Sequence, residues 1–369
     1  HAPPPPGGPG MNIAFVNATR RFGGVKAWTL DAARRLAQLG HRPLIAARPG
    51  PFLDSAQVAG LDARAWEFGM DYGPLGVARF LRLFREERTD IVICNVGKDL
   101  RLAGVAARLA GIPVVHRVGL PRDMEDSLKV RLTHRFLRPR LLAPCAYIRR
   151  DMARELSFVA EGDVTVIPIG KEPAPAAPDR ANTPRLILAT SQLNPDKGHA
   201  DLLDALARLA AQGLDFRCRI LGTGSEEGRL RARSAALGLE ERVQWAGFVA
   251  DVRAELARAD LFALPSRSEG LPNALLEAMA EGLLPVARDV GGVAEVWPAG
   301  LEDFLLPYAA GPDELAAALD AALALDDAAL LAARRAVWEH MAAHLSLEAQ
   351  TKALAAWLES VVREARHGR

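Results

Sequence analysis

The amino-acid sequence predicts an α/β protein with two Rossmann-like parallel-sheet domains that face a cleft. Short apolar runs alternate with longer amphipathic segments along nearly all of the chain, as in parallel sheets flanked by helices. The length of 369 residues is more than one hydrophobic core usually organises. A stretch rich in proline and alanine, residues 171–184, interrupts the alternation near the middle of the chain.

The first half begins like a Rossmann-type unit. An apolar strand pattern at residues 11–18 leads into a loop that contains Gly23 and Gly24, and a helix pattern then ends at Gly40. Backbone N–H groups at such a helix start can approach a phosphate, although a plain tight turn explains the two glycines as well. Strand patterns follow at residues 41–48, 90–97, 114–119 and 164–170, and helix patterns at residues 77–90 and 102–113.

The second half repeats this order of elements. Strand patterns lie at residues 185–191, 216–221, 242–249, 261–265 and 283–288. Helix patterns lie at residues 199–213, 226–238, 252–259, 272–282, 313–325, 327–344 and 346–367. We expect domains at residues 11–170 and 185–346, joined by the linker at residues 171–184. The terminal helix, residues 347–366, is expected to pack back on the first domain.

Bulk properties favour a cytoplasmic protein. Residues 1–10 look like an expression remnant before Met11 and lack the apolar core of a signal peptide. No apolar run reaches the roughly 18 residues of a membrane span. The three cysteines are odd in number and widely spaced, which favours reduced thiols over disulfides or a zinc site.

Charge is distributed unevenly between the two halves. Residues 11–170 hold 25 Lys and Arg against 16 Asp and Glu, whereas the rest of the chain holds 21 against 29. This asymmetry predicts an anionic partner for the first half, unless it reflects arginine-rich composition alone. Residues 121–150 interleave arginine with leucine and phenylalanine, which predicts a basic, partly apolar face at an anionic membrane surface. A solvated helical hairpin is the alternative. No motif typical of nucleic-acid binding is present.

The most informative stretch is residues 261–292, LFALPSRSEGLPNALLEAMAEGLLPVARDVGG. It reads as strand, loop, helix and strand, and its loop follows the carboxyl end of a strand, where open α/β sheets bind ligands. Glu269 lies in the loop. Glu277 lies in the helix among apolar residues, where a carboxylate needs partners that the hydroxyls of a ribose could supply. Gly270, Leu271, Pro272 and Asn273 begin the helix, whose free N–H groups suit phosphate or sugar oxygens.

Lys197 is a further candidate, because it precedes Gly198 at the start of a helix. A lysine at a helix N-terminus adds a point charge that suits a diphosphate. An exposed lysine at a loop tip is the alternative explanation.

These motifs resemble a known enzyme family. The segments LNPDKGHADLLDAL, RILGTGSEEGRL, VQWAGFV and PSRSEGLPNALLEAMAEGLLPVARDVGG are similar to the second domain of the retaining glycosyltransferases of family 4, which have the two-domain GT-B fold. The first half resembles that family more loosely, through RRFGGVKAW, VVHRVG and VIPIG.

The resemblance implies sugar transfer from a nucleotide-diphosphate donor, with net retention and without a metal or cofactor. The donor would be a UDP- or GDP-sugar, with UDP favoured, and the acceptor a cell-envelope glycan or glycolipid. The resemblance implies that Lys197 binds the diphosphate, that Glu269 contacts the sugar near the reacting centre, and that Glu277 binds the ribose. Backbone hydrogen bonds would come from the segment of Gly270, Leu271, Pro272 and Asn273. Val249 would contact the base, Gly24 would contact the phosphate, and His116 would contact the sugar and take part in catalysis.

One position departs from the family pattern. Gln192 stands where the family usually has an arginine, and its amide carries no charge. Either another cation replaces that arginine, with Arg20, Arg21 and Arg267 as candidates, or diphosphate binding is weaker.

Other functions remain open at this point. The acceptor could be a small soluble molecule such as an inositol or hydroxy acid, or a growing glucan. A sugar-nucleotide epimerase of the same fold and a non-catalytic sugar-nucleotide binding protein are further alternatives. A Rossmann oxidoreductase is disfavoured, because neither domain has a clean Gly-x-Gly-x-x-Gly at its first strand.

Overall fold

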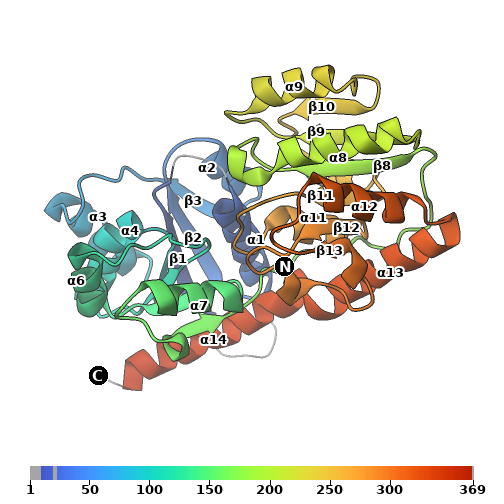
Figure 1. Cartoon of the computed structure of the whole chain (residues 1–369). Coiled ribbons are helices and arrows are strands. Elements are labelled where there is room, and N and C mark those ends of the chain that lie inside the picture. Colours follow the sequence, from blue (N-terminus) through green and yellow to red (C-terminus); the bar gives the residue numbers. More distant parts are fainter. Residues whose placement is uncertain (1–9, 20–22, 368–369) are drawn as a thin grey trace. The chain divides into compact units, whose positions relative to one another are not determined.

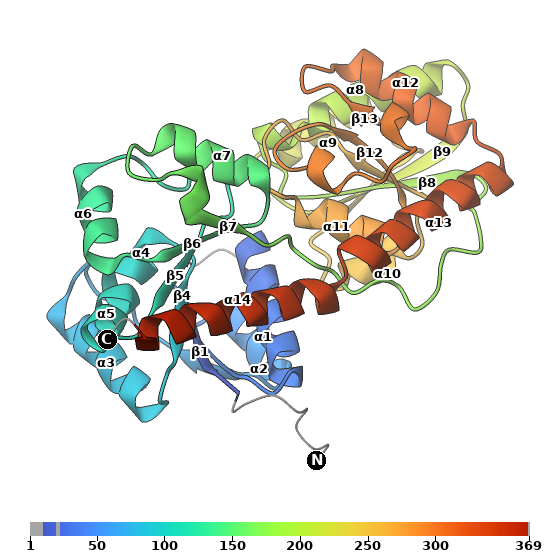
Figure 2. The same ribbon diagram turned by 90° about the horizontal axis from the view of Figure 1, so that it is seen from below.

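The computed structural model describes residues 10–19 and 23–367. The chain divides into two compact units, residues 1–170 with 347–369 and residues 171–346, here called the first unit and the second unit. Figures 1 and 2 show that each unit is a sheet with helices on both faces. The remnant predicted at residues 1–10, apart from Gly10, and the candidate cations Arg20 and Arg21 lie outside the described residues.

The first unit is built on a seven-stranded parallel sheet with the order β3-β2-β1-β4-β5-β6-β7. Alternate residues of β1 face opposite layers: Ala14 and Val16 join the core under α3, whereas the Phe15 ring lies 6.1 Å from that of Trp28 on α1. Burial on both faces explains the continuous apolar runs in these strands. The strands are β1 (Asn12–Asn17), β2 (Arg42–Ala47), β3 (Asp62–Ala65), β4 (Ile91–Cys94), β5 (Val114–Arg117), β6 (Arg140–Ala143) and β7 (Val164–Val166).

The helices of the first unit cover both faces of this sheet (Figure 2). They are α1 (Gly24–Gln38), α2 (Pro51–Val58), α3 (Pro74–Glu86), α4 (Gly97–Asp99), the π-helical η1 (Leu100–Gly104), α5 (Val105–Leu109), α6 (Leu128–Leu137), α7 (Ala146–Glu155), the 3₁₀ turn η2 (Glu161–Asp163) and α14 (Leu347–His367).

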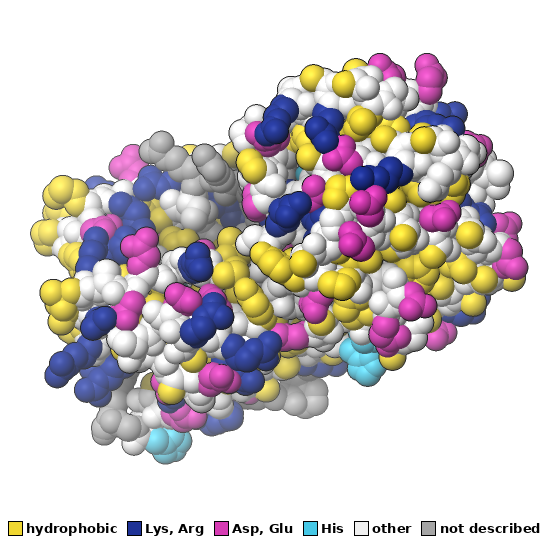
Figure 3. All heavy atoms as spheres, in the orientation of Figure 1, with side chains coloured by type: hydrophobic (Ala, Val, Ile, Leu, Met, Phe, Trp, Pro, Cys, Tyr) yellow, Lys and Arg dark blue, Asp and Glu magenta, His cyan; other side chains and the backbone are white. Residues whose placement is uncertain are grey.

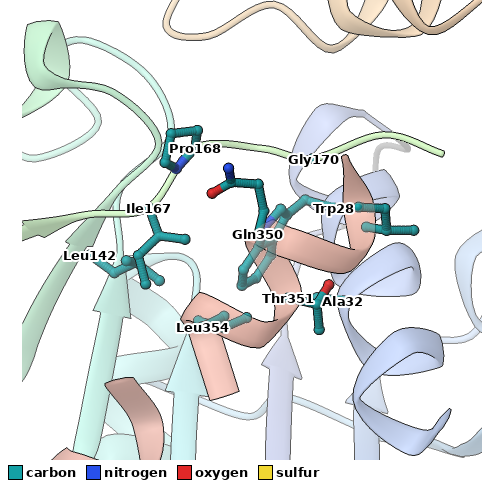
Figure 4. A pocket seen from close by; sticks show the side chains of 10 residues that line it. Trp28, Ala32, Leu142, Ile167, Pro168, Gly170, Gln350, Thr351 and Leu354 are labelled. Carbon is teal, nitrogen blue, oxygen red and sulfur yellow. The ribbon is translucent and has the colours of Figure 1, made fainter. Parts of the chain in front are cut away.

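The terminal helix α14 belongs to the first unit and packs beside α1. An ion pair of 3.2 Å joins Arg35 and Glu348 across the two helices. Figure 4 shows the cavity that remains between α14, α1 and the strand ends, with Trp28, Gln350 and Leu354 around it. The cavity volume is about 10 Å³, which suffices for one water molecule at most. It is therefore a packing gap and cannot hold a substrate.

Two parts of the first unit differ from the sequence-based expectation. Residues 121–150 do not form a helical hairpin, because β6 runs between α6 and α7 and pairs with β5 and β7. The apolar part of β6 is only Leu141–Leu142–Ala143, which is too short to stand out in an arginine-rich segment. The helix α2 and the edge strand β3 were not predicted at all. All four residues of β3 are at least partly exposed, so it lacks an apolar pattern.

The second unit contains a six-stranded parallel sheet with the order β10-β9-β8-β11-β12-β13. Its first strand, β8, lies between β9 and β11, so the direction of strand addition reverses beside β8. Ligands of open α/β sheets bind at such a switch point. The strands are β8 (Arg185–Thr190), β9 (Phe216–Leu221), β10 (Val243–Gly247), β11 (Leu261–Leu264), β12 (Leu284–Arg288) and β13 (Leu305–Leu306).

The helices of the second unit confirm the alternation that the sequence predicts, and Figure 1 shows α8 and α12 side by side. They are η3 (Pro195–Lys197), α8 (His199–Ala211), α9 (Glu227–Ala236), α10 (Val252–Leu256), α11 (Asn273–Ala280), η4 (Ala294–Val296), η5 (Glu302–Phe304), α12 (Pro312–Leu323) and α13 (Asp327–His344).

Residues 171–184, expected to be a linker, are fixed on the second unit although they form no helix. The backbone N–H of Ala174 donates to the carbonyl of Ala280 at 2.8 Å, and the indole N–H of Trp338 donates to the carbonyl of Ala174 at 2.9 Å. Asn182 donates from its backbone and its side chain to the buried carboxylate of Asp260. The chain therefore passes from one unit to the other at residues 170–171 and again at 346–347.

The cysteines are as the sequence predicts them. Cys94, Cys145 and Cys218 are free and buried. None of the helices in the described ranges is long and apolar enough to cross a lipid bilayer.

Candidate functional site at the switch point of the second sheet

The loop between β8 and α8 brings Lys197 to the switch point. A short 3₁₀ turn ends at Lys197, and Gly198 follows with a φ of +68° before α8 begins. A Cβ atom at position 198 would lie 2.0 Å from the carbonyl oxygen of Pro265. Only glycine therefore combines this left-handed conformation with this close approach to the neighbouring loop.

The loop between β11 and α11 carries Glu269 against Lys197. The Nζ atom of Lys197 lies 2.9 Å from Oε1 of Glu269 and donates to the carbonyl oxygen of Ser268 at 3.2 Å. The side chains of Lys197 and Glu269 are 18% and 10% exposed, so the pair lies near the surface but is largely shielded from water. The backbone N–H of Arg267 donates to the carbonyl of Asp196 at 2.8 Å and so joins the two loops.

The start of α11 lies against a turn that requires glycine. Gly291 has a φ of +63°, and a Cβ atom there would lie 2.4 Å from the carbonyl oxygens of Glu269 and Gly270. The N–H of Gly292 donates to the carbonyl of Gly270 at 2.7 Å. Pro272 is the N-cap of α11, and no side chain caps the helix there. The N–H groups of the first turn thus keep no intrahelical acceptor and can serve a ligand.

Side chains at the helix start differ in their surroundings. Leu271 is buried, so its side chain packs inside the unit and only its backbone can serve a ligand. The buried Oδ1 of Asn273 and the hydroxyl of Ser266 lack hydrogen-bond partners. A buried polar atom without a hydrogen-bond partner lowers the stability of the folded protein. A ligand or water bound beside these two atoms would supply the missing hydrogen bonds and so stabilise the folded protein.

Glu277 lies one helical turn after Asn273 and has a partner that the sequence did not reveal. Its Oε1 is 2.9 Å from Nζ of Lys171, whose side chain is only 8% exposed, while that of Glu277 is 33% exposed. The two residues are far apart in the sequence, so no local pattern could predict the ion pair. The apolar neighbours of Glu277 did indicate that its carboxylate needs a partner.

A buried arginine holds the two loops in register. Arg288 is fully buried at the end of β12 and donates through Nη1 to the carbonyl of Pro265, and through Nη2 to Asp201 at 2.5 Å. Asp201, in the first turn of α8, also accepts from Arg267 at 2.6 Å. This cluster ties the start of α8 to the loop that carries Glu269. The sequence analysis did not assign Arg288 or Asp201, because the strand pattern of β12 hides the arginine.

The remaining candidates of the second unit lie on the neighbouring loops. Gln192 is exposed after β8, and its Oε1 accepts from the side-chain amide of Asn194 at 3.1 Å. Val249 follows β10 at the edge of the sheet, next to Phe248, which is 77% exposed. Arg267, a candidate replacement for the missing arginine, is 56% exposed and paired with Asp201.

Two candidates lie in the first unit. Gly24 is the first residue of α1. His116 is within β5, is 2% exposed and has its ring 5.3 Å from that of His134. Burial, together with the neighbouring His134, lowers the pKa of His116 to about 3, so its imidazole is neutral at physiological pH. Its Nδ1 atom lacks a hydrogen-bond partner.

The switch point of the first sheet contains a carboxylate that the sequence analysis missed. Asp99 is fully buried and accepts hydrogen bonds from the N–H groups of Ala18, Asn95 and Val96 at 2.8, 3.0 and 3.1 Å. It therefore joins the carboxyl ends of β1 and β4. Burial raises the pKa of Asp99 to about 7. Its contacts give it the role of fixing the backbone at Ala18 and Asn95.

Metal ligands were not expected from the sequence. In residues 10–19 and 23–367, no three side chains of His, Cys, Asp or Glu are grouped so that they could hold a metal ion.

Both sheets are parallel and wound from their centre, and the switch point of the second sheet holds a lysine, two glutamates and a helix start. These features are typical of Rossmann-like α/β proteins that bind ligands. The family model of the glycosyl transferases group 1 matches residues 170–337, and that of Glycosyltransferase Family 4 matches residues 22–173. The chain belongs to the group 1 glycosyltransferases of GT-B fold.

Individual relatives agree with this assignment. The chain is 37% identical over 139 residues to the lipopolysaccharide core biosynthesis mannosyltransferase LpsB of Rhizobium meliloti. The aligned region covers 37% of this chain and 39% of that protein. The chain is 28% identical over 235 residues to the UDP-Gal:alpha-D-GlcNAc-diphosphoundecaprenol alpha-1,3-galactosyltransferase of Escherichia coli, covering 57% and 60%. The chain spans only about a third of the length of other curated relatives that it matches.

Solved structures show the same fold. Anabaena Alr3699/HepE, crystallised in complex with UDP, superimposes with a TM-score of 0.79 at 21% identity, over 95% of this chain and 100% of that chain. The GT-B fold predicted from the sequence is thereby confirmed.

Proposed function

We propose that this protein is a retaining, metal-independent glycosyltransferase that moves a hexose from a nucleotide-diphosphate sugar, with UDP favoured, to a hydroxyl acceptor. The observation that carries the proposal is the contact of Lys197 with Glu269 at the switch point, beside the start of α11. Two relatives, a mannosyltransferase and a UDP-Gal-dependent galactosyltransferase, support it.

Each part of the donor has a candidate partner in the second unit. Lys197, whose ammonium group lies against Asp196, Glu269 and the carbonyl of Ser268, would bind the diphosphate through its positive charge. Glu269 would contact the sugar. Glu277 would accept from the ribose hydroxyls, while Val249 would lie beside the base. The residues from Gly270 to Asn273 would offer backbone N–H groups, apart from Pro272, which has none.

The chemistry follows from these charges. Breaking the bond between the anomeric carbon and the phosphate oxygen leaves an oxocarbenium-like sugar and a diphosphate. Lys197 and the N–H groups at the start of α11 would stabilise the growing negative charge of the diphosphate. An acceptor hydroxyl that attacks from the face the phosphate leaves can pass its proton to that phosphate. Retention then needs no covalent intermediate on a carboxylate, unlike in retaining hydrolases.

The roles of Gly24 and His116 stay predictions. The ring of His116 is neutral and one of its nitrogens is unpaired, so it can donate or accept one hydrogen bond. This suits contact with a sugar hydroxyl better than it suits a charged acid.

We also propose that the first unit binds an anionic membrane and that the reaction takes place at the inner face of the plasma membrane, on a cell-envelope glycolipid or polysaccharide precursor. Leu128, Leu132 and Phe136 recur every four residues along α6 and are 72%, 56% and 49% exposed. Lys129, Arg131 and Arg135 alternate with them on the same helix. Figure 3 shows hydrophobic side chains beside Lys and Arg at the edge of this unit. The Lys and Arg side chains suit contact with anionic lipid headgroups, and the hydrophobic side chains suit insertion at the boundary between headgroups and acyl chains.

Vesicle flotation tests the membrane part. The protein should float with vesicles that contain phosphatidylglycerol and stay behind with vesicles of phosphatidylcholine alone, at low salt. Leu132→Glu should reduce flotation, whereas Leu109→Glu, at a residue 61% exposed on α5, should leave it unchanged. Absent flotation with both kinds of vesicle would point to a small soluble acceptor, and flotation that is independent of lipid charge would contradict the role of the basic residues.

A transfer assay tests the enzymatic part. The protein is incubated with UDP-glucose, UDP-galactose and GDP-mannose and a lipid-linked acceptor mixture, and the anomeric proton of the product is followed by NMR. An α-linked product from an α-linked donor, lost in Glu269→Gln, supports a retaining transferase. A β-linked product would overturn retention.

The second candidate function, a non-catalytic sugar-nucleotide binding protein, is favoured by one observation, the neutral Gln192 where the family has an arginine. Tight binding of a sugar nucleotide without release of its nucleoside diphosphate, across all acceptors, would support the binding protein instead.

A further inference from the structure

Lys171 forms an unusual contact for a lysine, because its side chain is almost completely removed from water. It is 8% exposed, and its Nζ atom lies 2.9 Å from Oε1 of Glu277. Removing an ammonium group from water is costly unless an anion lies beside it. The Glu277 carboxylate provides that anion, so the two side chains constrain each other.

The backbone of Lys171 is fixed as well. It is the first residue of the second unit, and its N–H donates to the carbonyl of Leu345 at 3.0 Å. Lys171 also forms a parallel β-bridge with Ser346, the last residue of that unit. The residue that contacts Glu277 is thus held where the chain enters and leaves the second unit.

The pair leaves part of Glu277 available to a ligand. Lys171 approaches Oε1, and a third of the Glu277 side chain is exposed. A carboxylate oxygen has more than one acceptor site, so an ammonium on one oxygen does not prevent hydroxyl groups from donating to the other. The ion pair also fixes the rotation of the carboxylate. An exposed, unpaired glutamate on a helix would instead lose side-chain entropy when it takes up one orientation to bind a ligand.

We propose that Lys171 is a positioning residue that aims the Glu277 carboxylate at the two hydroxyls of the donor ribose. This inference rests on the proposed function, in which Glu277 binds ribose. Lys171 itself does not touch the donor. Its effect is the discrimination between a ribose and a 2′-deoxyribose, because only an oriented carboxylate accepts from both hydroxyls at once.

The test is the ratio of the dissociation constants of 2′-deoxy-UDP and UDP, measured by calorimetry for the wild type, Lys171→Met and Glu277→Gln. Because 2′-deoxy-UDP lacks one of the two hydroxyls, it loses one hydrogen bond to a charged group, which predicts a wild-type ratio of about 10 or more. In Lys171→Met the ratio should fall to within about threefold of the Glu277→Gln ratio. The affinity for inorganic pyrophosphate should stay the same, because Lys197 is unchanged.

An unchanged ratio in a folded Lys171→Met would overturn the proposal. If Lys171→Met does not fold, Lys171→Gln replaces it under the same criterion, since its amide keeps a hydrogen bond but not the charge. Pyrophosphate weakened together with UDP would also overturn it, because that result indicates general disruption. If the wild type binds neither nucleotide, the proposed function fails first, and this outcome differs from all the others.

Discussion

The ammonium of Lys197 and the carboxylate of Glu269 are in contact at 2.9 Å, although they come from loops 72 residues apart in the sequence. The sheet order explains why, since β8 and β11 are neighbours and their carboxyl ends bring both loops to the same place. A diphosphate at this point would share the lysine with the glutamate. Under the proposed function, the contact would link the leaving group and the sugar through one pair of side chains.

Removing the charge of Lys197 should impair transfer. In Lys197→Met we expect kcat/KM for the nucleotide sugar to fall by about 10²- to 10³-fold, as for the loss of one donor that stabilises a developing anion. Steady-state kinetics with the preferred donor provide the measurement. Lys352→Met, which removes an exposed lysine of α14, is the matched control and should keep wild-type kinetics. Equal rates in both variants would remove Lys197 from the mechanism.

A methyl group at position 198 should displace the loop of Lys197. Gly198→Ala and Gly213→Ala both place alanine at a positive φ, but only the first meets a backbone oxygen, at 2.0 Å. Gly213→Ala should therefore lose about 1 kcal/mol of unfolding free energy. Gly198→Ala should lose clearly more and also bind UDP more weakly. Urea denaturation and calorimetry measure the two effects, and indistinguishable variants would contradict the predicted clash.

The buried pair of Asp260 and Arg334 should be a major element of stability in the second unit. Asp260 is fully buried and lies 3.1 Å from the guanidinium of Arg334, which is 5% exposed. Asp260→Ala leaves a buried cation without its anion, which costs about 3–5 kcal/mol. The control Asp327→Ala breaks a pair whose carboxylate is 71% exposed and should cost below about 1 kcal/mol. Similar denaturation midpoints for both variants would contradict this ranking.

Stability should fall on mild acidification because buried histidines remain neutral. Burial lowers the pKa of His116 to about 3 and those of His134 and His199 to about 4. Below the ordinary value of 6.5 the unfolded chain binds protons that the folded chain does not, so stability decreases as pH falls from 7 toward 4. At pH 5.5 each histidine should cost about 1 kcal/mol relative to pH 7.

Thermal midpoints between pH 7 and 5 measure this effect. His134→Gln removes one of the three histidines, so the midpoint should depend less steeply on pH than in the wild type. Because burial also raises the pKa of Asp99 to about 7, that carboxyl opposes the histidines over this range, so the comparison of the two slopes decides. Equal slopes for the wild type and His134→Gln would show that His134 is protonated in the folded protein over this range.

The elements near the site were predictable because their signals are local. Apolar strands, Lys197 with Gly198 at a helix start and the start of α11 all follow from short stretches, and parallel strands place their loops on one edge. By contrast, Lys171, Arg288 and Asp99 gave no signal, since each acts through partners distant in the sequence or hidden in an apolar pattern. Periodicity cannot reveal an ion pair that exists only after folding.

Short strands escaped prediction for a related reason. The strand β6 is four residues long and begins with an exposed arginine, and β13 has only two residues. Neither offers enough alternation to compete with the helical segments around it. Both strands are fixed by pairing with neighbouring strands, β13 with β12 and β6 with β5 and β7, which is tertiary information.

The most direct test of the donor site is the thermal midpoint of the protein with UDP, compared with uridine at the same concentration. At about 100 times its dissociation constant UDP should add about 2.7 kcal/mol. This corresponds to a rise of several degrees, at about 2–4 °C per kcal/mol for a unit of this size. Uridine, which lacks the diphosphate for Lys197, should raise the midpoint far less. A midpoint unchanged by UDP, GDP and their sugars alike would contradict a nucleotide-sugar site at the switch point.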